Sequence, residues 1–363
     1  MAISQARFDA LAERAIEVMW KQWLSLGANL SGEPVSSVMI DPEALLMATC
    51  TIGRHEVRLF DEALDWLVIN YKLLSANRLI QLMRTYPESD RRVLAAVDEW
   101  VAARAGTEMA FKGLRRSVER PEDYQHTKPL WTSGARNSPR EPDAVFRSWG
   151  LLRGAARLRR HSKPPDLHCP ANVMLSARAV YGKGVRADVL AYLCCIEKAQ
   201  KNSRSIAGRL YCDQTGVLRA LKSLMQTGVV ENLNQAGRGA SGYYRIKSEA
   251  ALEPLGIKSR PLFANWPELY RTINEALADV ADYPSAWESE LLAGERARDI
   301  TASVVPRMRK SCDAFSELPV PEIAESGPRS FVLGLLGFLD AAMTKAEDVI
   351  DAQVGERDRD MFR

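Results

Sequence analysis

Three side chains that can donate hydrogen bonds, Thr215, Arg219 and Lys222, recur at positions i, i+4 and i+7 of one segment. In a helix, residues at this spacing share one face. A hydroxyl, a guanidinium and an ammonium group can donate to phosphate oxygens and to base edges in a major groove. The sequence therefore predicts a nucleic-acid contact along this face. Further candidate contact residues are its neighbours Gln214 and Leu218, and Arg204 from the preceding segment.

The segment that carries this polar face has the pattern of an amphipathic helix. Its apolar stripe is formed by Val217, Leu221 and Leu224. This stripe is two residues out of phase with the polar one, and two residues turn a helix by about 200°, so the stripes face opposite ways. Asp213 is a good N-cap residue, and Gly228 suits a helix that ends in a left-handed residue. The pattern predicts a helix over residues 214–227.

Two shorter helical segments precede this helix, and a hairpin follows it. The first spans residues 185–199 and the second residues 203–210, each with apolar residues at helical spacing. Two β-rich runs, at 229–233 and 243–246, then flank a glycine cluster. The hairpin tip holds Arg238 among small residues, which let an arginine approach a backbone or a minor groove closely. Three helices and a two-stranded wing are therefore expected.

The stretch of about 185–246 resembles the bacterial winged helix-turn-helix transcriptional regulators. The residues that carry the resemblance are Ile206 and Ala207, then Val217, Leu221 and Leu224, then Gly228, Val229 and Val230 with the glycine-bearing wing. The resemblance implies that Thr215, Arg219 and Lys222 contact the groove or its phosphates, and that Arg238 is the wing contact.

Two residues depart from the common pattern of these regulators. Gly216 lies near the start of the reading helix and lowers its helix propensity. Leu218 stands where a polar contact residue is usual. An exposed leucine can touch a thymine methyl group, or it can mark a surface that faces another protein.

A chain of 363 residues is long enough for two or three domains. We expect a mainly α, multi-domain helical protein with a central winged helix-turn-helix domain and a small β-hairpin wing. The expected regions are an N-terminal helical domain at 1–110, a basic, proline-containing linker or arm at 111–175, the winged helix-turn-helix domain at 176–250 and a C-terminal helical domain at 255–353.

Charge is distributed unevenly along the chain. Residues 111–245 hold 24 Lys and Arg against 10 Asp and Glu, a net charge of +14, whereas the rest of the chain sums to −11. A basic block that coincides with a helix-turn-helix pattern is typical of nucleic-acid binders. Within this block, residues 111–175 have two interpretations: a solvated linker that packs loosely, or a basic arm that follows DNA phosphates.

Two further helical features each leave two interpretations open. Residues 59–71 and 75–85 form a second helix-turn-helix, in which Asn77, Arg78 and Arg84 supply the polar groups, or a simple αα-hairpin. The last helix, expected over 330–352, is strongly apolar in its first half. It contributes to a homodimer contact or to the intramolecular core.

The sequence offers no constellation for catalysis or for a cofactor. Residues 237–242 match the glycine spacing of a dinucleotide-binding loop, but a β-type run follows where that loop needs a helix. His161, His168 and Cys169 lie close together, but a structural zinc needs four ligands and no fourth candidate lies nearby. We therefore expect a protein that is not an enzyme and holds neither cofactor nor metal.

Targeting signals and cysteines indicate a cytoplasmic protein. No run approaches the ~20 apolar residues of a membrane span, and no apolar N-terminal segment has the form of a signal peptide. None of the six cysteines forms a C-x-x-C pair, which suits a reducing compartment. A thiol redox sensor is the alternative that the cysteines leave open.

The function expected from these patterns is that of a DNA-binding protein, a transcriptional regulator with double-stranded DNA as its partner. The alternative is an interaction protein, such as an antitoxin or an assembly subunit, whose winged domain contacts protein or RNA. The patterns point to no small-molecule effector.

Overall fold

Helices make up most of the structure, a computed structural model that describes residues 2–121, 128–131, 141–196, 202–234, 242–310, 314–315, 317–319, 321 and 327–352. The expected mainly α class is therefore confirmed. Within this part of the chain, four short strands form two separate two-stranded sheets. β1 (Lys128–Pro129) pairs in parallel with β2 (Leu151–Leu152), and β3 (Val230–Asn232) pairs antiparallel with β4 (Tyr244–Ile246).

Two of the N-terminal helices, α2 and α4, begin at residues whose side chains cap them. Asp41 accepts a hydrogen bond from the Ala44 N–H at 3.0 Å at the start of α2, and Pro42 is the first residue of that helix. Ser75 caps α4 by accepting from the Arg78 N–H. The helices of this region are α1 (Ala2–Ser25), α2 (Pro42–Thr51), α3 (Val57–Asn70), α4 (Ala76–Met83) and α5 (Glu88–Ala105).

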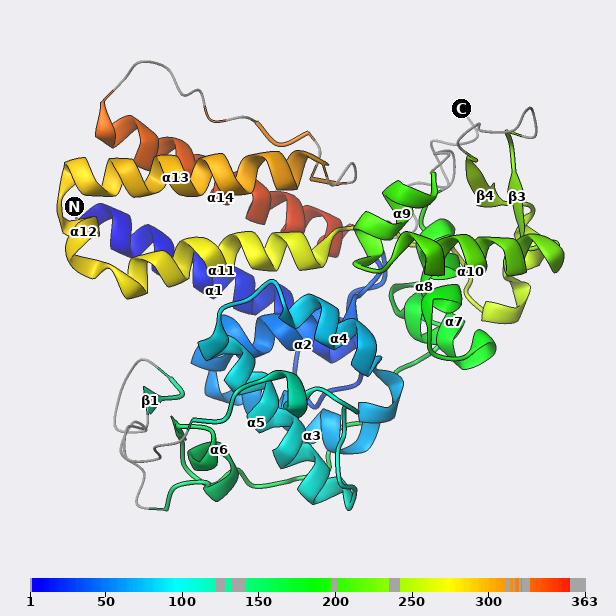
Figure 1. The fold of residues 1–363 in the computed structure, drawn as a ribbon, viewed down its shortest axis with the longest axis horizontal. Coiled ribbons are helices and arrows are strands. Elements are labelled where there is room, and N and C mark those ends of the chain that lie inside the picture. Colours follow the sequence, from blue (N-terminus) through cyan, green and yellow to red (C-terminus); the bar gives the residue numbers. More distant parts are fainter. Residues whose placement is uncertain are drawn as a thin grey trace.

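Helices from the two ends of the chain lie side by side, α1 against α14 and α11 (Figure 1). Arg14 forms two hydrogen bonds to Glu347, each of 2.7 Å, and Arg7 and Lys21, one heptad to either side, bond to Asp340 and Asp351. The C-terminal helices are α11 (Trp266–Asp282), α12 (Pro284–Glu288), α13 (Glu290–Lys310) and α14 (Pro328–Asp351). The apolar side chains of both ends belong to one continuous core.

The apolar half of α14 is part of this core. Its buried side chains include Leu335, Leu336, Phe338, Leu339 and Met343. They face α13 and α1, so the residues that suggested a dimer contact are used within the chain. Leu333 alone among the large apolar residues of α14 is more than a third exposed in the described part of the chain.

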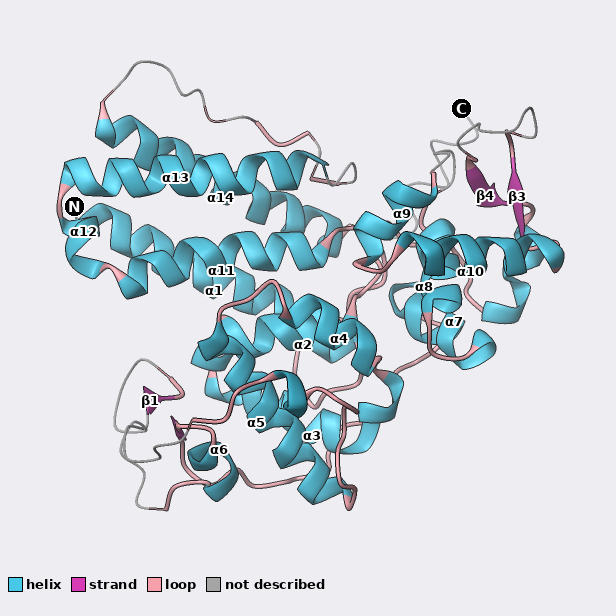
Figure 2. Ribbon diagram, in the orientation of Figure 1, coloured by secondary structure: helices cyan, strands magenta, loops and turns pink. Residues whose placement is uncertain are grey.

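A second, smaller core lies beneath helices of residues 173–226 and the β3–β4 hairpin. These elements form the unit at the right of Figure 1, with the hairpin beside α10 (Figure 2). The helices are α7 (Val173–Tyr181), α8 (Val185–Cys194), α9 (Ser203–Leu210) and α10 (Gln214–Gln226). α8 is shorter than expected because the N–H groups of Cys195 and Ile196 bond three residues back, to Tyr192 and Leu193, instead of continuing the helical pattern.

No helix in the described residues is long and apolar enough to cross a membrane. The short helix α6 (Ala144–Ser148) and the parallel β1–β2 pair organise the described parts of residues 111–175. These parts pack on α3 and α5 rather than standing apart from the helical body.

Candidate nucleic-acid interface

The core of residues 173–263 supports α10 from one side. Val217, Leu221 and Leu224 are at most 1% exposed and contact α8 and α9. Their burial turns the opposite face of α10 to solvent. Thr215, Arg219 and Lys222 lie on that face, and the other candidate contact residues of α10, Gln214 and Leu218, are also exposed.

The start of α10 is fixed by a side-chain cap. Asp213 accepts a hydrogen bond of 2.6 Å from the Gly216 N–H. A Cβ at residue 216 would lie 2.8 Å from the Asp213 carboxylate, so glycine is the residue that leaves room for this cap. The glycine that lowers helix propensity therefore permits the bond that begins the helix. At the other end, Gly228 has the expected left-handed φ of 74°.

The turn between α9 and α10 is short and well supported. The C-cap residue of α9 is Tyr211, which adopts a left-handed φ of 52° and donates its backbone N–H to the Ala207 carbonyl. Gln214 donates to the Ser203 hydroxyl at 3.0 Å, which joins the N-terminal ends of the two helices. Arg204 is exposed next to this joint. The N-terminal ends of both helices therefore lie close together.

The cations on this face have no carboxylate partner in the part of the chain that the structure describes. Among the described residues, no Asp or Glu lies within ion-pair distance of Arg219, Lys222 or Arg204. Arg245 of the hairpin, by contrast, is paired with Glu231 at 2.6 Å. Unpaired cations on an exposed face are available to an anionic partner. The wing residue Arg238 and the glycine cluster around it lie outside the described residues.

Many other arginines of the basic block are paired with carboxylates of the chain itself. They pair with carboxylates of the N-terminal helices or the residues beside them: Arg115 with Asp98, Arg120 with Glu99, Arg153 with Asp61, Arg159 with Glu62, and Arg178 with Glu43. Ion pairs therefore connect the basic block to the acidic N-terminal region. The charge excess seen in the sequence overstates the positive charge that faces solvent.

Arg153 shows how far a sequence-level cation can be from a phosphate contact. Its side chain is 2% exposed, and its guanidinium lies 2.7 Å from Asp61. The same group packs 5.0 Å from the ring centroid of Phe146 and 5.1 Å from that of Trp131. Arg153 therefore stabilises the core by ion pairing and cation–π contact.

Asp65 holds the basic stretch of residues 159–162 on α3. Its two carboxylate oxygens accept hydrogen bonds from four successive backbone N–H groups, at 2.6–3.2 Å. Burial by itself would raise the pKa of Asp65, but these backbone donors lower it below its ordinary value. The stretch is a bound arm, and Arg157, Arg160 and Lys163 project from it into solvent.

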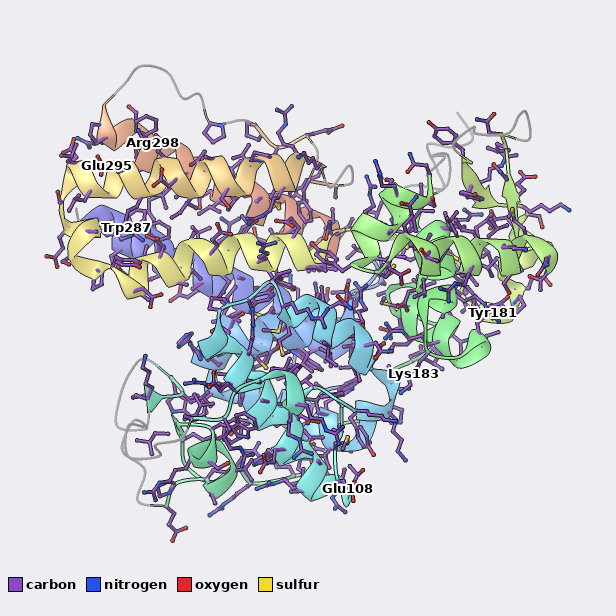
Figure 3. All side chains as sticks on the ribbon, viewed as in Figure 1. Glu108, Tyr181, Lys183, Trp287, Glu295 and Arg298 are labelled. Carbon is purple, nitrogen blue, oxygen red and sulfur yellow. The ribbon has the colours of Figure 1, made fainter. Side chains whose placement is uncertain are left out.

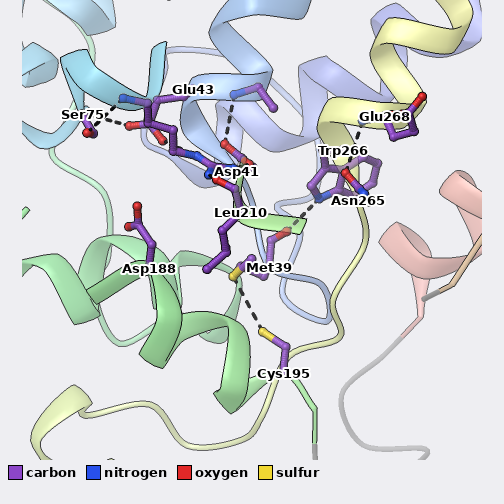
Figure 4. A network of polar contacts seen from close by, with 12 residues as sticks. Met39, Asp41, Glu43, Ser75, Asp188, Cys195, Leu210, Asn265, Trp266 and Glu268 are labelled. Atoms are coloured by element: carbon purple, nitrogen blue, oxygen red, sulfur yellow. Dashed lines mark hydrogen bonds and ion pairs between the residues drawn. The ribbon is translucent and has the colours of Figure 1, made fainter. Parts of the chain in front are cut away.

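A network of buried charges joins the unit of α7–α10 to the N-terminal helices (Figure 4). Arg178 of α7 bonds to both oxygens of Glu43, at 2.7 and 2.9 Å, and to Asp188 at 2.9 Å. Arg78 of α4 bonds to Asp41 and to the Leu210 carbonyl at the end of α9. Burial by itself would lower the pKa of the Arg178 guanidinium, but Glu43 and Asp188 raise it above its ordinary value.

The local sequence pattern does not predict this network. One signal was present: Arg178 interrupts an apolar helical segment, and a buried arginine needs a carboxylate. The structure removes one of the three polar groups expected for a second helix-turn-helix, because Arg78 is 6% exposed and is paired with Asp41. Asn77 and Arg84 of α4 remain exposed.

The C-terminal helices also contact the turn between α9 and α10. Tyr211 donates to Glu268 of α11 at 3.1 Å, and Glu268 is paired with Arg307 of α13 at 2.7 Å. Trp266 donates to the Met39 carbonyl at 2.7 Å. Together with Arg78, these contacts fix the start of α10 relative to both ends of the chain.

The cysteines and histidines form no metal-binding group in the described residues. No three His, Cys, Asp or Glu side chains come together there as a metal site requires. Burial raises the pKa of Cys194 to about 12 and that of Cys212 to about 11, which keeps both as thiols and argues against a thiolate sensor. Cys312 lies outside the described residues.

Comparison of the chain with protein-family models, curated proteins and solved structures finds no match.

Proposed function

We propose that the chain is a DNA-binding protein, a transcriptional regulator that reads a major groove with α10 of a winged helix-turn-helix domain at about 185–246. The observation that carries this proposal is the exposed face of α10, where Arg219 and Lys222 have no carboxylate partner among the described residues. A helix of 13 residues is about 20 Å long, which suits a major groove.

Each side chain on this face has a role that its chemistry allows. Arg219 donates two parallel hydrogen bonds to a guanine edge or to a phosphate, and Lys222 neutralises a phosphate. Thr215 and Gln214 donate near the start of the helix, where Arg204 of α9 reaches the flanking backbone. Leu218, which is 44% exposed, packs on a thymine methyl group.

The test is fluorescence-anisotropy binding to a duplex from the gene's own upstream region and to a scrambled duplex, across a salt series. We expect Arg219→Ala to weaken binding on the order of tenfold, since one bidentate base contact contributes about 1–3 kcal/mol. Lys222→Ala lowers the salt slope by about 1. Arg238→Ala tests the wing contact in the same assay.

The matched control is Arg298→Ala, on the exposed surface of α13 at the far end of the molecule (Figure 3). It removes one charge and leaves binding unchanged. Unchanged affinity in all of the α10 and wing variants, with an unchanged helical CD spectrum, rejects the groove model.

A second candidate function is protein binding by the same unit, as in an antitoxin or an assembly subunit. It is favoured by exposed apolar residues on α10 and the hairpin: Leu218 at 44%, Leu233 at 36% and Tyr243 at 36%. Contact through such residues persists at high salt, whereas phosphate binding weakens steeply. The salt series therefore separates the two functions.

A further inference from the structure

A cleft of about 790 Å³ lies between α4 and the turn that leads into α10. One wall is the exposed face of α4, where Asn77, Gln81 and Arg84 recur at positions i, i+4 and i+7. The other wall is formed by two segments: residues 183–188, where α8 begins, and residues 207–213, at the end of α9 and the turn that follows. The cleft therefore lies between the N-terminal helices and the start of the proposed reading helix.

The floor of this cleft carries charges that are already compensated. Arg78 is paired with Asp41 and Glu43, and Asp188 is paired with Arg178. These residues are at most 6% exposed and belong to the buried network. They hold the two walls together, and the floor offers a ligand no positive charge, because its two arginines are outnumbered by three carboxylates.

The rim carries charges that are not compensated. Among the described residues, neither Arg84 nor Lys183 has a carboxylate within ion-pair distance; Arg84 reaches only Gln81, and Lys183 only the Leu74 carbonyl. Partial burial is the main cause that lowers the pKa of Lys183; the nearby Arg178 lowers it further, and Glu43 opposes both. Asp213, the carboxylate that the described residues place on the rim, keeps its charge at the turn, where it caps α10. The features that favour an anion are therefore the two unpaired cations of the rim, Arg84 and Lys183.

The arrangement of the two cations favours an extended anion over a compact one. Lys183 donates to the carbonyl of Leu74, two residues before α4, whereas Arg84 follows the last residue of that helix. Eight helical residues separate these ends by about 12 Å. A nucleic-acid strand carries a charge about every 3.4 Å along the axis and presents a phosphate near each end. Asn77 and Gln81 between them have the amide donors that commonly contact phosphates.

The cleft also lies where a bound duplex would continue past α10. Its lining includes Gly208 of α9 and Asp213, the residue that immediately precedes α10. Gly208 leaves open space, since a Cβ there would meet no atom within 4 Å. We propose that this cleft holds the sugar–phosphate backbone beside the groove that α10 reads, with Arg84 and Lys183 as phosphate contacts. The inference rests on the proposed function and extends it to α4.

The test uses the full chain and a duplex of about three helical turns, in the anisotropy assay across a salt series. For Arg84→Gln/Lys183→Gln we expect affinity for the native and the scrambled duplex to fall by the same factor, on the order of tenfold. The salt slope falls by roughly 1.8, since each phosphate contact contributes about 0.9. Arg84→Lys/Lys183→Arg, which keeps both charges, retains the slope.

The control Arg298→Gln/Arg329→Gln removes two exposed charges from α13 and α14. Arg298 lies far from Lys183 (Figure 3), and Arg329 follows Pro328, which lies against Gly294 near the start of α13. This control keeps the affinity of the unmodified protein. If the cleft variant binds like this control while Arg219→Ala loses affinity, the cleft inference is overturned and the proposed function stands. If no variant and no unmodified protein binds either duplex, the proposed function fails and the inference with it.

A separate arm tests for a small phosphorylated ligand in place of DNA. Thermal unfolding is followed with inorganic pyrophosphate and no DNA. A rise in Tm that depends on Arg84 and Lys183, with a DNA salt slope that does not depend on them, assigns the cleft to a free ligand and overturns the inference. No rise in Tm, with the reduced slope, supports it.

Discussion

At the scale of single residues, carboxylates decide which cations are available. Asp65, Glu43 and Asp61 each bind a basic segment or side chain that the sequence presents as part of a positive block. Arg219 and Lys222 are left without such a partner among the described residues. The sequence distinguishes these two groups only weakly, because a pairing partner lies up to 135 residues away in the chain.

Asp65→Asn is predicted to release the arm of residues 159–162. An asparagine offers one oxygen and no charge in place of the two oxygens that accept four N–H bonds. We expect a loss of about 1–3 kcal/mol of stability and faster trypsin cleavage after Arg157, Arg159 and Arg160. Equal cleavage rates in the variant and the unmodified protein contradict the anchoring role.

The same carboxylate predicts a pH dependence. Because its folded pKa lies below the ordinary value of 3.8, the stability that Asp65 contributes is fully present above that value. It is lost as the pH falls through the lower, folded pKa. Trypsin is inactive in that range, so pepsin cleavage or hydrogen exchange of the arm measures the loss, and Asp65→Asn removes this part of the pH dependence.

At the scale of elements, α10 divides into a face for the core and a face for solvent. Leu221 is fully buried and Leu218 is 44% exposed, although the two leucines are three residues apart on the same helix. The division follows from the 3.6-residue period and from the apolar surface of α8 and α9 beneath. The Asp213 cap and Gly216 set where this division begins.

Leu221→Ala and Leu218→Ala form a matched pair that tests this division. We expect Leu221→Ala to cost about 2–5 kcal/mol of stability, because it leaves a cavity in the core. Leu218→Ala costs less than about 0.5 kcal/mol. Urea unfolding followed by CD measures both, and a similar cost for the two variants shows that α10 is oriented differently.

At the scale of the whole molecule, the two ends of the chain build one core. α1 packs on α14 and α11, and a row of cations on α1 faces carboxylates on α14. Regions 1–110 and 255–353, which the sequence suggests as separate domains, share that core. The unit with α10 is attached to both by the charge network and by the Tyr211–Glu268 bond.

A chain that ends at residue 255 is predicted not to fold on its own. Removing α11–α14 exposes the apolar side of α1 and α2 that Trp266, Leu269 and Ile273 cover. The loss of so large a contact area exceeds the marginal stability of a domain. We expect no near-UV CD signal from the N-terminal helices and no cooperative urea transition of the whole fragment; a cooperative transition of the whole fragment contradicts this prediction.

The sequence by itself determined the local features of this protein: its helical class, the caps at Asp41, Ser75 and Asp213, the left-handed Gly228, and which face of α10 is polar. These follow from nearest-neighbour geometry and from the helical period, which act over a few residues. Only the tertiary structure decided that Arg153 and Arg178 are buried, that the arm is bound to Asp65, and that α1 and α14 meet. Such pairings depend on burial and on partners distant in the chain, and neither property is encoded in local spacing.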